Sequence, residues 1–145
     1  MAKDSASQSI AERLKSPPPY PCTAVFTNEL PASWDVHIIA VGADFFYDDG
    51  TSAQVGPVAV DVVGPSGTVS LSSPNPLKCV NKVFGGASVK APGEDPHLLT
   101  KTNTGQPGFC MLQTFFRVVP INTVKSAAHA KGLKVEDVVE LIDRS

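Results

Sequence analysis

The 145-residue sequence lacks a long hydrophobic run, a closely spaced cysteine pair and, over much of its first half, basic residues. No apolar stretch approaches the roughly 20 residues of a membrane-spanning helix, and the polar start MAKDSASQSIAERLKS does not resemble a signal peptide. Residue 2 is alanine, which argues against N-myristoylation. A hydrophobic fraction of 42% with 18% charged residues is typical of one globular domain.

The three cysteines, Cys22, Cys79 and Cys110, are an odd number at wide spacings, and no two of them form a CxxC pair. This spacing gives no support to a zinc site. We therefore expect reduced, partly buried thiols in a cytosolic protein.

No catalytic constellation is recognisable, and no glycine-rich phosphate or dinucleotide loop is present. His37 lies within an apolar strand segment, where we expect a hydrogen-bonded or surface-facing side chain. His97 and Cys110 are conceivable as base and nucleophile, but Cys110 lies inside a predicted strand rather than at a nucleophile turn. The adjacent Asp48 and Asp49 indicate a hairpin tip rather than a cation site. We expect a protein that binds and assembles, with no enzymatic activity, cofactor or metal ion.

The charge is unevenly distributed, although the net charge is only −2. Residues 16–77 contain no Lys or Arg and six acidic residues, whereas residues 78–134 contain eight basic and two acidic residues, a net charge of +6. The two segments could attract each other within one molecule or between copies, or the basic segment could face lipid or nucleic acid. A third interpretation is a set of solvated charges without a role. We predict that the two segments meet across a homo-oligomer interface.

Alternation of apolar and polar residues predicts a β-rich body. In TVSLSS, Val69 and Leu71 share one face, while Thr68 and Ser70 share the other. Turn signals occur at 48–50 (DDG) and 64–67 (GPSG). The predicted strand segments are 23–30, 34–47, 55–63, 68–73, 77–84 and 109–119. The stretch 85–108, with five glycines and three prolines, predicts a long surface loop.

The two ends of the chain show helical signals. SIAERLK (9–15) has Ser9 and Glu12 in capping-box spacing and Ile10 and Leu14 one turn apart, which favours a short helix of marginal stability. NTVKSAAHAKG (122–132) predicts a helix that stops at its glycine. A second amphipathic helix is predicted over 135–144 from one apolar stripe, Val135, Val138, Val139 and Ile142.

Together these patterns predict an α+β fold: a small, mostly antiparallel β-sandwich with C-terminal helices and a flexible, proline-rich N-terminal tail. The tail is expected to span residues 1–21, and a single globular domain to span residues 22–145.

The tail contains the pattern Pro-Pro-x-Tyr, formed by Pro17, Pro18, Pro19 and Tyr20. Consecutive prolines impose an extended polyproline II conformation, so a binding partner has little conformational entropy to remove. WW domains take the prolines of this pattern in an aromatic groove and its tyrosine in a second pocket. The alternative is a stiff linker in which the tyrosine is incidental.

A Pro-Pro-x-Tyr motif in a tail before a β-rich body resembles the matrix proteins of enveloped negative-strand RNA viruses, such as rhabdoviruses and filoviruses. In these families the motif is a late domain that recruits WW-bearing ubiquitin ligases and, through them, the membrane-scission machinery. The segments MLQTFFRVV and NTVKSAAHAKG are similar to the small matrix proteins of bornaviruses. That resemblance implies a β-sandwich with packed helices that oligomerises and binds membrane and RNA. One departure is the net charge of −2, because viral matrix proteins are usually basic.

The resemblance implies a matrix protein in the virion beneath the envelope, and in the host cytoplasm at the inner face of membranes. Its implied partners are further copies of itself, a host WW-domain ubiquitin ligase, an anionic membrane surface, and the viral nucleocapsid or RNA. The residues expected to contact the anionic surface are Lys78, Lys82, Lys90, Lys101, Lys125, Lys131 and Lys134. The alternatives are a small viral capsid or coat protein, a cellular β-sandwich adaptor with the same motif, and a small hydrolase.

Overall fold

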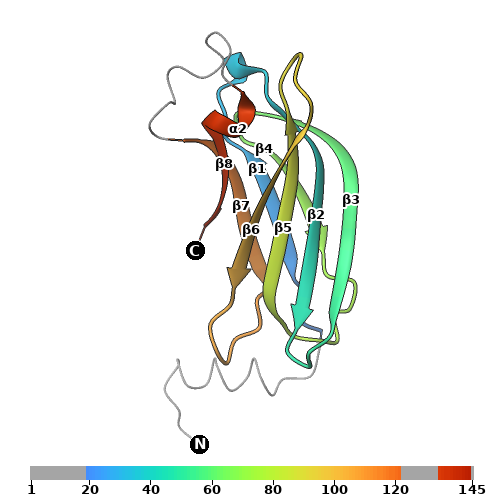
Figure 1. Cartoon of the computed structure of the whole chain (residues 1–145). Coiled ribbons are helices and arrows are strands. Elements are labelled where there is room, and N and C mark those ends of the chain that lie inside the picture. The colour runs from blue at the N-terminus through green and yellow to red at the C-terminus, as the bar shows by residue number, and fades with distance from the viewer. Residues whose placement is uncertain (1–18, 122–133, 145) are drawn as a thin grey trace, which may run out of the picture.

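The computed structural model describes residues 19–121 and 134–144. Within these ranges the chain forms eight strands, one 3-10 turn and one four-residue helix (Figure 1). The elements are β1 (Thr23–Asn28), η1 (Ala32–Trp34), β2 (His37–Tyr47), β3 (Ser52–Val63), β4 (Gly67–Ser72), β5 (Val80–Lys90), β6 (His97–Thr104), β7 (Gln113–Pro120), α2 (Val135–Val138) and β8 (Val139–Arg144).

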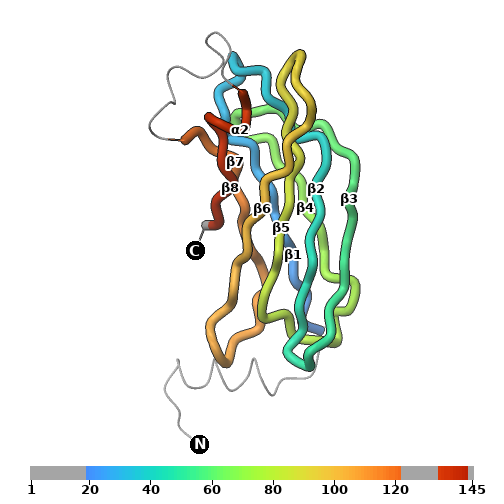
Figure 2. Tube along the Cα trace, in the orientation of Figure 1, coloured from blue at the N-terminus to red at the C-terminus, as the bar shows by residue number. Residues whose placement is uncertain are grey.

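The strands form two four-stranded sheets that pack face to face (Figures 1 and 2). Sheet A has the order β4-β1-β7-β8, and sheet B has the order β3-β2-β5-β6. β1 and β7 pair in parallel, whereas the other pairings described are antiparallel. The mostly antiparallel β-sandwich predicted from the sequence is therefore confirmed.

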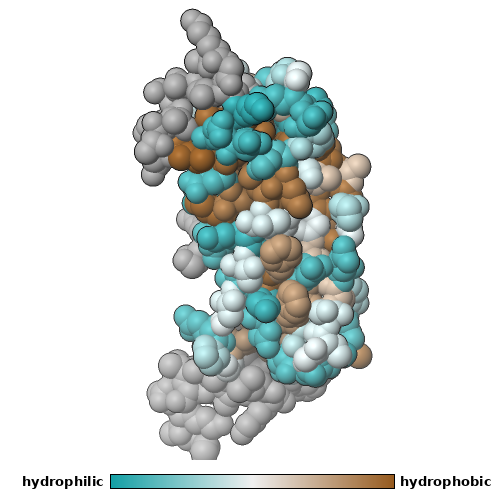
Figure 3. Space-filling view, in the orientation of Figure 1, coloured by the Kyte–Doolittle hydropathy of each residue, from teal (hydrophilic) through white to brown (hydrophobic). Residues whose placement is uncertain are grey.

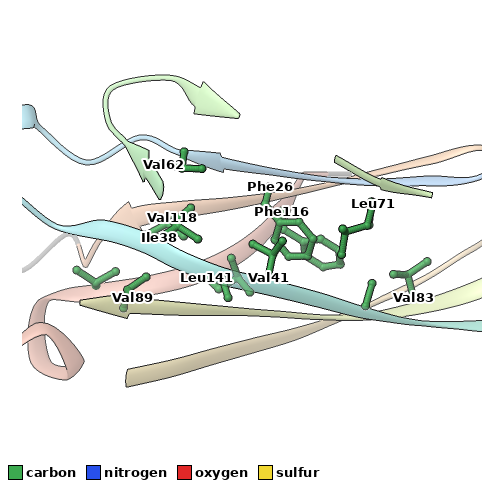
Figure 4. Packing of buried hydrophobic residues seen from close by; sticks show 14 of the residues in the cluster. Phe26, Ile38, Val41, Val62, Leu71, Val83, Val89, Phe116, Val118 and Leu141 are labelled. Carbon is green, nitrogen blue, oxygen red and sulfur yellow. The ribbon is translucent and has the colours of Figure 1, made fainter. Parts of the chain in front are cut away.

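The core lies between the sheets because alternate side chains of each strand point inward. In β1, Ala24, Phe26 and Asn28 are fully buried, while the residues between them are partly exposed. The rings of Phe26 and Phe116 stack with centroids 5.1 Å apart, and both side chains are inaccessible to solvent (Figure 4). The two sheets therefore meet over aromatic side chains contributed by the paired strands β1 and β7 of sheet A.

The prediction of a long loop over 85–108 is wrong. Residues 80–90 form one continuous strand, β5, and residues 97–104 form its antiparallel neighbour, β6. A Cβ atom at Gly85 would lie 2.7 Å from the ring of Phe116, so this position of the strand requires a glycine. The glycine therefore allows close packing between the sheets instead of marking a turn.

The predicted helix over 135–144 is also wrong beyond its first turn. Only Val135–Val138 is helical, and Val139–Arg144 forms an edge strand, β8, that pairs with β7. As a strand, β8 buries Val139 and Leu141 against the core and satisfies the backbone groups of β7. The described residues are therefore almost entirely β rather than α+β. The helix predicted over 122–132 lies outside the described residues.

The prediction of three reduced thiols is wrong for two of them. Cys79, just before β5, and Cys110, before β7, are joined by a disulfide, while Cys22 is free and buried. The bond joins segments 31 residues apart, a pairing that sequence spacing alone could not identify. Burial raises the pKa of the Cys22 thiol to about 12, which keeps that thiol protonated and unreactive.

Candidate functional site

The proline-rich motif reaches the body at its last residue. Pro17 and Pro18 lie outside the described residues, whereas Pro19 is exposed and Tyr20 is partly buried. The backbone N–H of Tyr20 donates a hydrogen bond to the carbonyl of Pro76. The C-terminal end of the motif is therefore anchored on the loop between β4 and β5.

Tyr20 borders a small hollow at the end of the sandwich that lies at the bottom of Figure 1. The hollow has a volume of about 250 Å³, and its other walls are the β2–β3 turn and the residues around the disulfide. Volumes of about 300–1,000 Å³ are typical of small-molecule sites, so this hollow is small for a ligand. It holds the motif tyrosine next to Lys78, Cys79 and Cys110.

The β2–β3 turn at this end is held by Asp49, which confirms the prediction of a hairpin tip. Its Oδ1 accepts hydrogen bonds from the backbone N–H and the hydroxyl of Thr51, and its Oδ2 lies 3.0 Å from Nζ of Lys78. The bonds from Thr51, and then the one from Lys78, lower the pKa of Asp49 to about 2. Lys78 also lies over the ring of Tyr47, so its charge is already engaged within the molecule.

Four of the other basic residues predicted to contact an anionic surface lie in the described part of the chain, and they are spread over several elements. Lys82 and Lys90 lie eight residues apart on β5, which separates their Cα atoms by about 27 Å. Lys101 on β6 pairs with Gly85 on β5, which is buried, so Lys101 lies on the core-facing side of the sheet. Lys82 and Lys90 lie on its outer side. Lys134 is exposed before α2, and Lys125 and Lys131 lie outside the described residues. The four lysines Lys78, Lys82, Lys90 and Lys101 therefore share neither one loop nor one strand face.

Two acidic residues of the first half pair with the basic half inside one molecule. Arg117 on β7 donates two hydrogen bonds of 2.7 Å to the carboxylate of Glu29, and Lys78 pairs with Asp49. A bidentate guanidinium–carboxylate pair has fixed geometry and is stronger than a single contact. These two pairs favour the intramolecular interpretation of the charge asymmetry for the residues that form them.

A cluster that the sequence analysis did not recognise surrounds His37. Its Nδ1 lies 2.7 Å from the carboxylate of Asp61 on β3, and its Nε2 lies 3.0 Å from that of Asp35. The bond to Asp61 and then the bond to Asp35 raise the pKa of His37. Lys90 is its cross-strand neighbour on β5. The prediction that His37 is hydrogen-bonded or surface-facing is confirmed. The sequence does not reveal the whole cluster, because the register between β2, β3 and β5 brings its members together.

His97 and Cys110, considered above as base and nucleophile, are not brought together. Cys110 follows the C-terminal end of β6 and is bonded to Cys79. His97 begins β6, and its Nδ1 lies 3.7 Å from the carboxylate of Glu136. In the parts of the chain that the structure describes, no group of three or more His, Cys, Asp or Glu side chains could hold a metal ion. No helix within those parts is long and apolar enough to cross a membrane.

The outer face of sheet B, the face turned away from the core, carries a shallow hollow of about 200 Å³. Gly42 on β2 and Gly86 on β5 lie directly opposite each other in its floor, and Asp44, Phe84 and Leu98 stand around it. Figure 3 looks onto this sheet, where pale and brown residues gather between teal patches. We call the hollow lined by Gly42, Asp44, Phe84, Gly86 and Leu98 the outer-face hollow.

Comparison of the chain with models of known protein families finds no match, and neither does comparison with curated protein sequences.

Proposed function

We propose that this protein is the matrix protein of an enveloped virus, which self-associates beneath the envelope, contacts anionic membrane and recruits host WW-domain ubiquitin ligases. The observation that carries the proposal is the Pro-Pro-x-Tyr motif directly before the first strand of a β-sandwich. Pro19 of this motif is exposed, and the first strand begins only three residues after Tyr20. A WW domain that binds the motif at this position would therefore be held close to the β-sandwich.

The anchored tyrosine is compatible with binding to a WW domain. A hydrogen bond from the backbone N–H of Tyr20 to the carbonyl of Pro76 ties the backbone of the motif to the loop. Such a bond contributes a net stabilisation of about 0.5–1.5 kcal/mol, whereas a complex with micromolar affinity is stabilised by about 8 kcal/mol. Release of this hydrogen bond therefore lowers the affinity for a WW domain without abolishing binding.

Calorimetric titration with a WW domain from a ubiquitin ligase tests this assignment. Tyr20→Ala should abolish binding without changing the melting temperature, because Tyr20 lies outside the hydrophobic core. Pro21→Ala is the matched control, since this exposed proline follows the motif without belonging to it. Equal affinity of the parent and Tyr20→Ala, or no binding by the parent, would overturn the assignment.

Membrane contact is proposed for the oligomer rather than for one molecule. Each lysine near an anionic leaflet contributes on the order of 1 kcal/mol, and the lysines in the described part of one molecule do not form a single patch. Several copies acting together multiply this small contribution. In flotation with phosphatidylserine vesicles, a combined Lys82→Glu, Lys90→Glu and Lys101→Glu variant should stay unbound.

Lys78→Gln is the control for this experiment, because Lys78 is already paired with Asp49. It should float as the parent does. If the triple variant also floats like the parent, these lysines have no part in membrane binding.

A further inference from the structure

The two glycines in the floor of the outer-face hollow are not required by the packing of the fold. A Cβ atom on Gly42 would have its nearest neighbour at 3.5 Å, and so would one on Gly86, which is ordinary van der Waals contact. Neither glycine has a positive φ angle. By contrast, a Cβ on Gly85 would clash with Phe116. Since glycine weakens a strand, two opposed and dispensable glycines indicate that another group approaches the backbone here.

The walls of the hollow define the chemistry of that group. Phe84 and Leu98 keep 38% and 61% of their surface exposed, so they offer apolar contact. Asp44 lies directly opposite Phe84 and, within the part of the chain described, takes part in no ion pair. A volume of about 200 Å³ is smaller than typical small-molecule sites. The hollow fits one or two apolar side chains accompanied by a cationic group.

The N-terminal segment of the same chain carries this combination. In a helix over 9–15, Ile10, Arg13 and Leu14 lie on one face, because residues three and four apart are neighbours. Lys15 lies on another side of the helix. The segment is too short to be stable alone, so it needs an apolar surface to pack against.

The segment can reach the hollow from where the described chain begins. Tyr20 and Asp48 border the same small hollow at the end of the sandwich, and Asp44 lies four residues further along β2, at about 14 Å. Five residues lead from Lys15, the end of this helix, to Tyr20, and at about 3.1 Å per residue in polyproline II they span about 16 Å. The connection is therefore long enough without any change in the body.

We infer that residues 9–15 dock on the outer-face hollow of their own molecule, with Ile10 and Leu14 over Gly42 and Gly86 and with Arg13 paired to Asp44. Seven residues bury little surface, so docked and free tails exchange, and the motif at 17–20 is accessible in the free form. The flexible tail expected over residues 1–21 stays a prediction. The inference does not rest on the proposed matrix function.

Nuclear Overhauser measurements on the full-length protein with labelled Ile and Leu methyl groups test the docking. The expected result is cross-peaks from the Ile10 and Leu14 methyl groups to the Phe84 ring and to the amides of Gly42 and Gly86. Arg13→Glu should remove these cross-peaks, whereas Lys15→Glu, the matched charge change on another helix side, should leave them. Combining Arg13→Glu with Asp44→Arg should restore them.

A second variant fills the hollow instead of changing the tail. Gly86→Val should displace the segment, and it should leave the fold intact because a Cβ is accommodated there. Absence of cross-peaks in the parent, or their persistence in both Arg13→Glu and Gly86→Val, would overturn the inference. Cross-peaks found only between labelled and unlabelled molecules in a mixed sample would also overturn it, because the occupant would then be a second copy.

Discussion

Asn28 at the end of β1 should be among the most sensitive positions of the fold. Its side chain is fully buried, and its amide nitrogen donates to the carbonyls of Val36 and Val62, each at 3.0 Å. Its Oδ1 accepts a hydrogen bond of 3.0 Å from the backbone of Leu30. One side chain thereby connects β1 of sheet A with β3 of sheet B and with the segment that follows η1.

Asn28→Ala would remove three hydrogen bonds to buried backbone groups. Each unsatisfied group costs about 1–3 kcal/mol, and partial entry of water reduces the sum, so we expect a loss of about 3–5 kcal/mol. That is a large part of the roughly 5–15 kcal/mol that stabilises a typical domain. Replacement of Asn28 should therefore lower the urea midpoint markedly.

Urea unfolding followed by the fluorescence of Trp34 measures this loss. Trp34 is buried in η1, so its emission should report unfolding. Thr27→Ala is the control, because within the described residues the hydroxyl of Thr27 has only an exposed 3.5 Å contact with Thr68. This substitution should change stability by less than about 0.5 kcal/mol. A loss below about 1 kcal/mol for Asn28→Ala would refute the role assigned to its hydrogen bonds.

Three further predictions concern His37, the cysteines and the glycines of β5. Because the pKa of His37 is raised in the folded protein, the stabilisation from its bonds to Asp61 and Asp35 is complete below about pH 6.5 and is lost as the pH rises through the folded-state pKa. His37→Gln should flatten that part of the melting-temperature profile against pH, and parallel profiles for parent and variant would contradict this. Thiol titration of unfolded, unreduced protein should find one reactive cysteine, Cys22, and three after reduction; three before reduction would exclude the disulfide. Gly85→Ala should destabilise the protein by about 1–3 kcal/mol through its clash with Phe116, and Gly86→Ala should not; equal urea midpoints would show that the sheets can separate at Gly85.

The parts of the fold that the sequence predicts correctly are those where local pattern and tertiary packing agree. The alternation of Val69 and Leu71 with polar residues lies on β4, and the β1 segment buries every second residue as expected. The turn at Asp48–Gly50 lies between β2 and β3. In each case one face of a strand covers the core, so a period of two is visible in the residues themselves.

The failures have physical causes in particular residues. β6 is an edge strand with three exposed threonines, so it carries too few apolar residues to be recognised as a strand. The valines of 135–142 fit a helical stripe, but Val139 and Leu141 also alternate, and pairing with β7 decides between the two. Sequence alone does not reveal which distant strands become neighbours.

The same limit applies to the candidate sites. The Pro-Pro-x-Tyr motif is local, so the sequence reveals it directly. The Asp35–His37–Asp61 cluster, the opposed Gly42 and Gly86, and the disulfide all depend on pairing between segments that are distant in the sequence. The arrangement of the lysines is not local either, because the length of β5 separates Lys82 from Lys90 and the register places Lys101 on the opposite face of the sheet.

The most direct measurement of the proposed function is the release of particles from cells that express this protein alone. A matrix protein that assembles beneath the membrane and recruits scission factors should release membrane-enclosed particles containing the protein. Tyr20→Ala should reduce this release strongly while Pro21→Ala leaves it unchanged, at equal expression of all three proteins. Absence of particles from the parent, or equal release by the parent and Tyr20→Ala, would contradict the account.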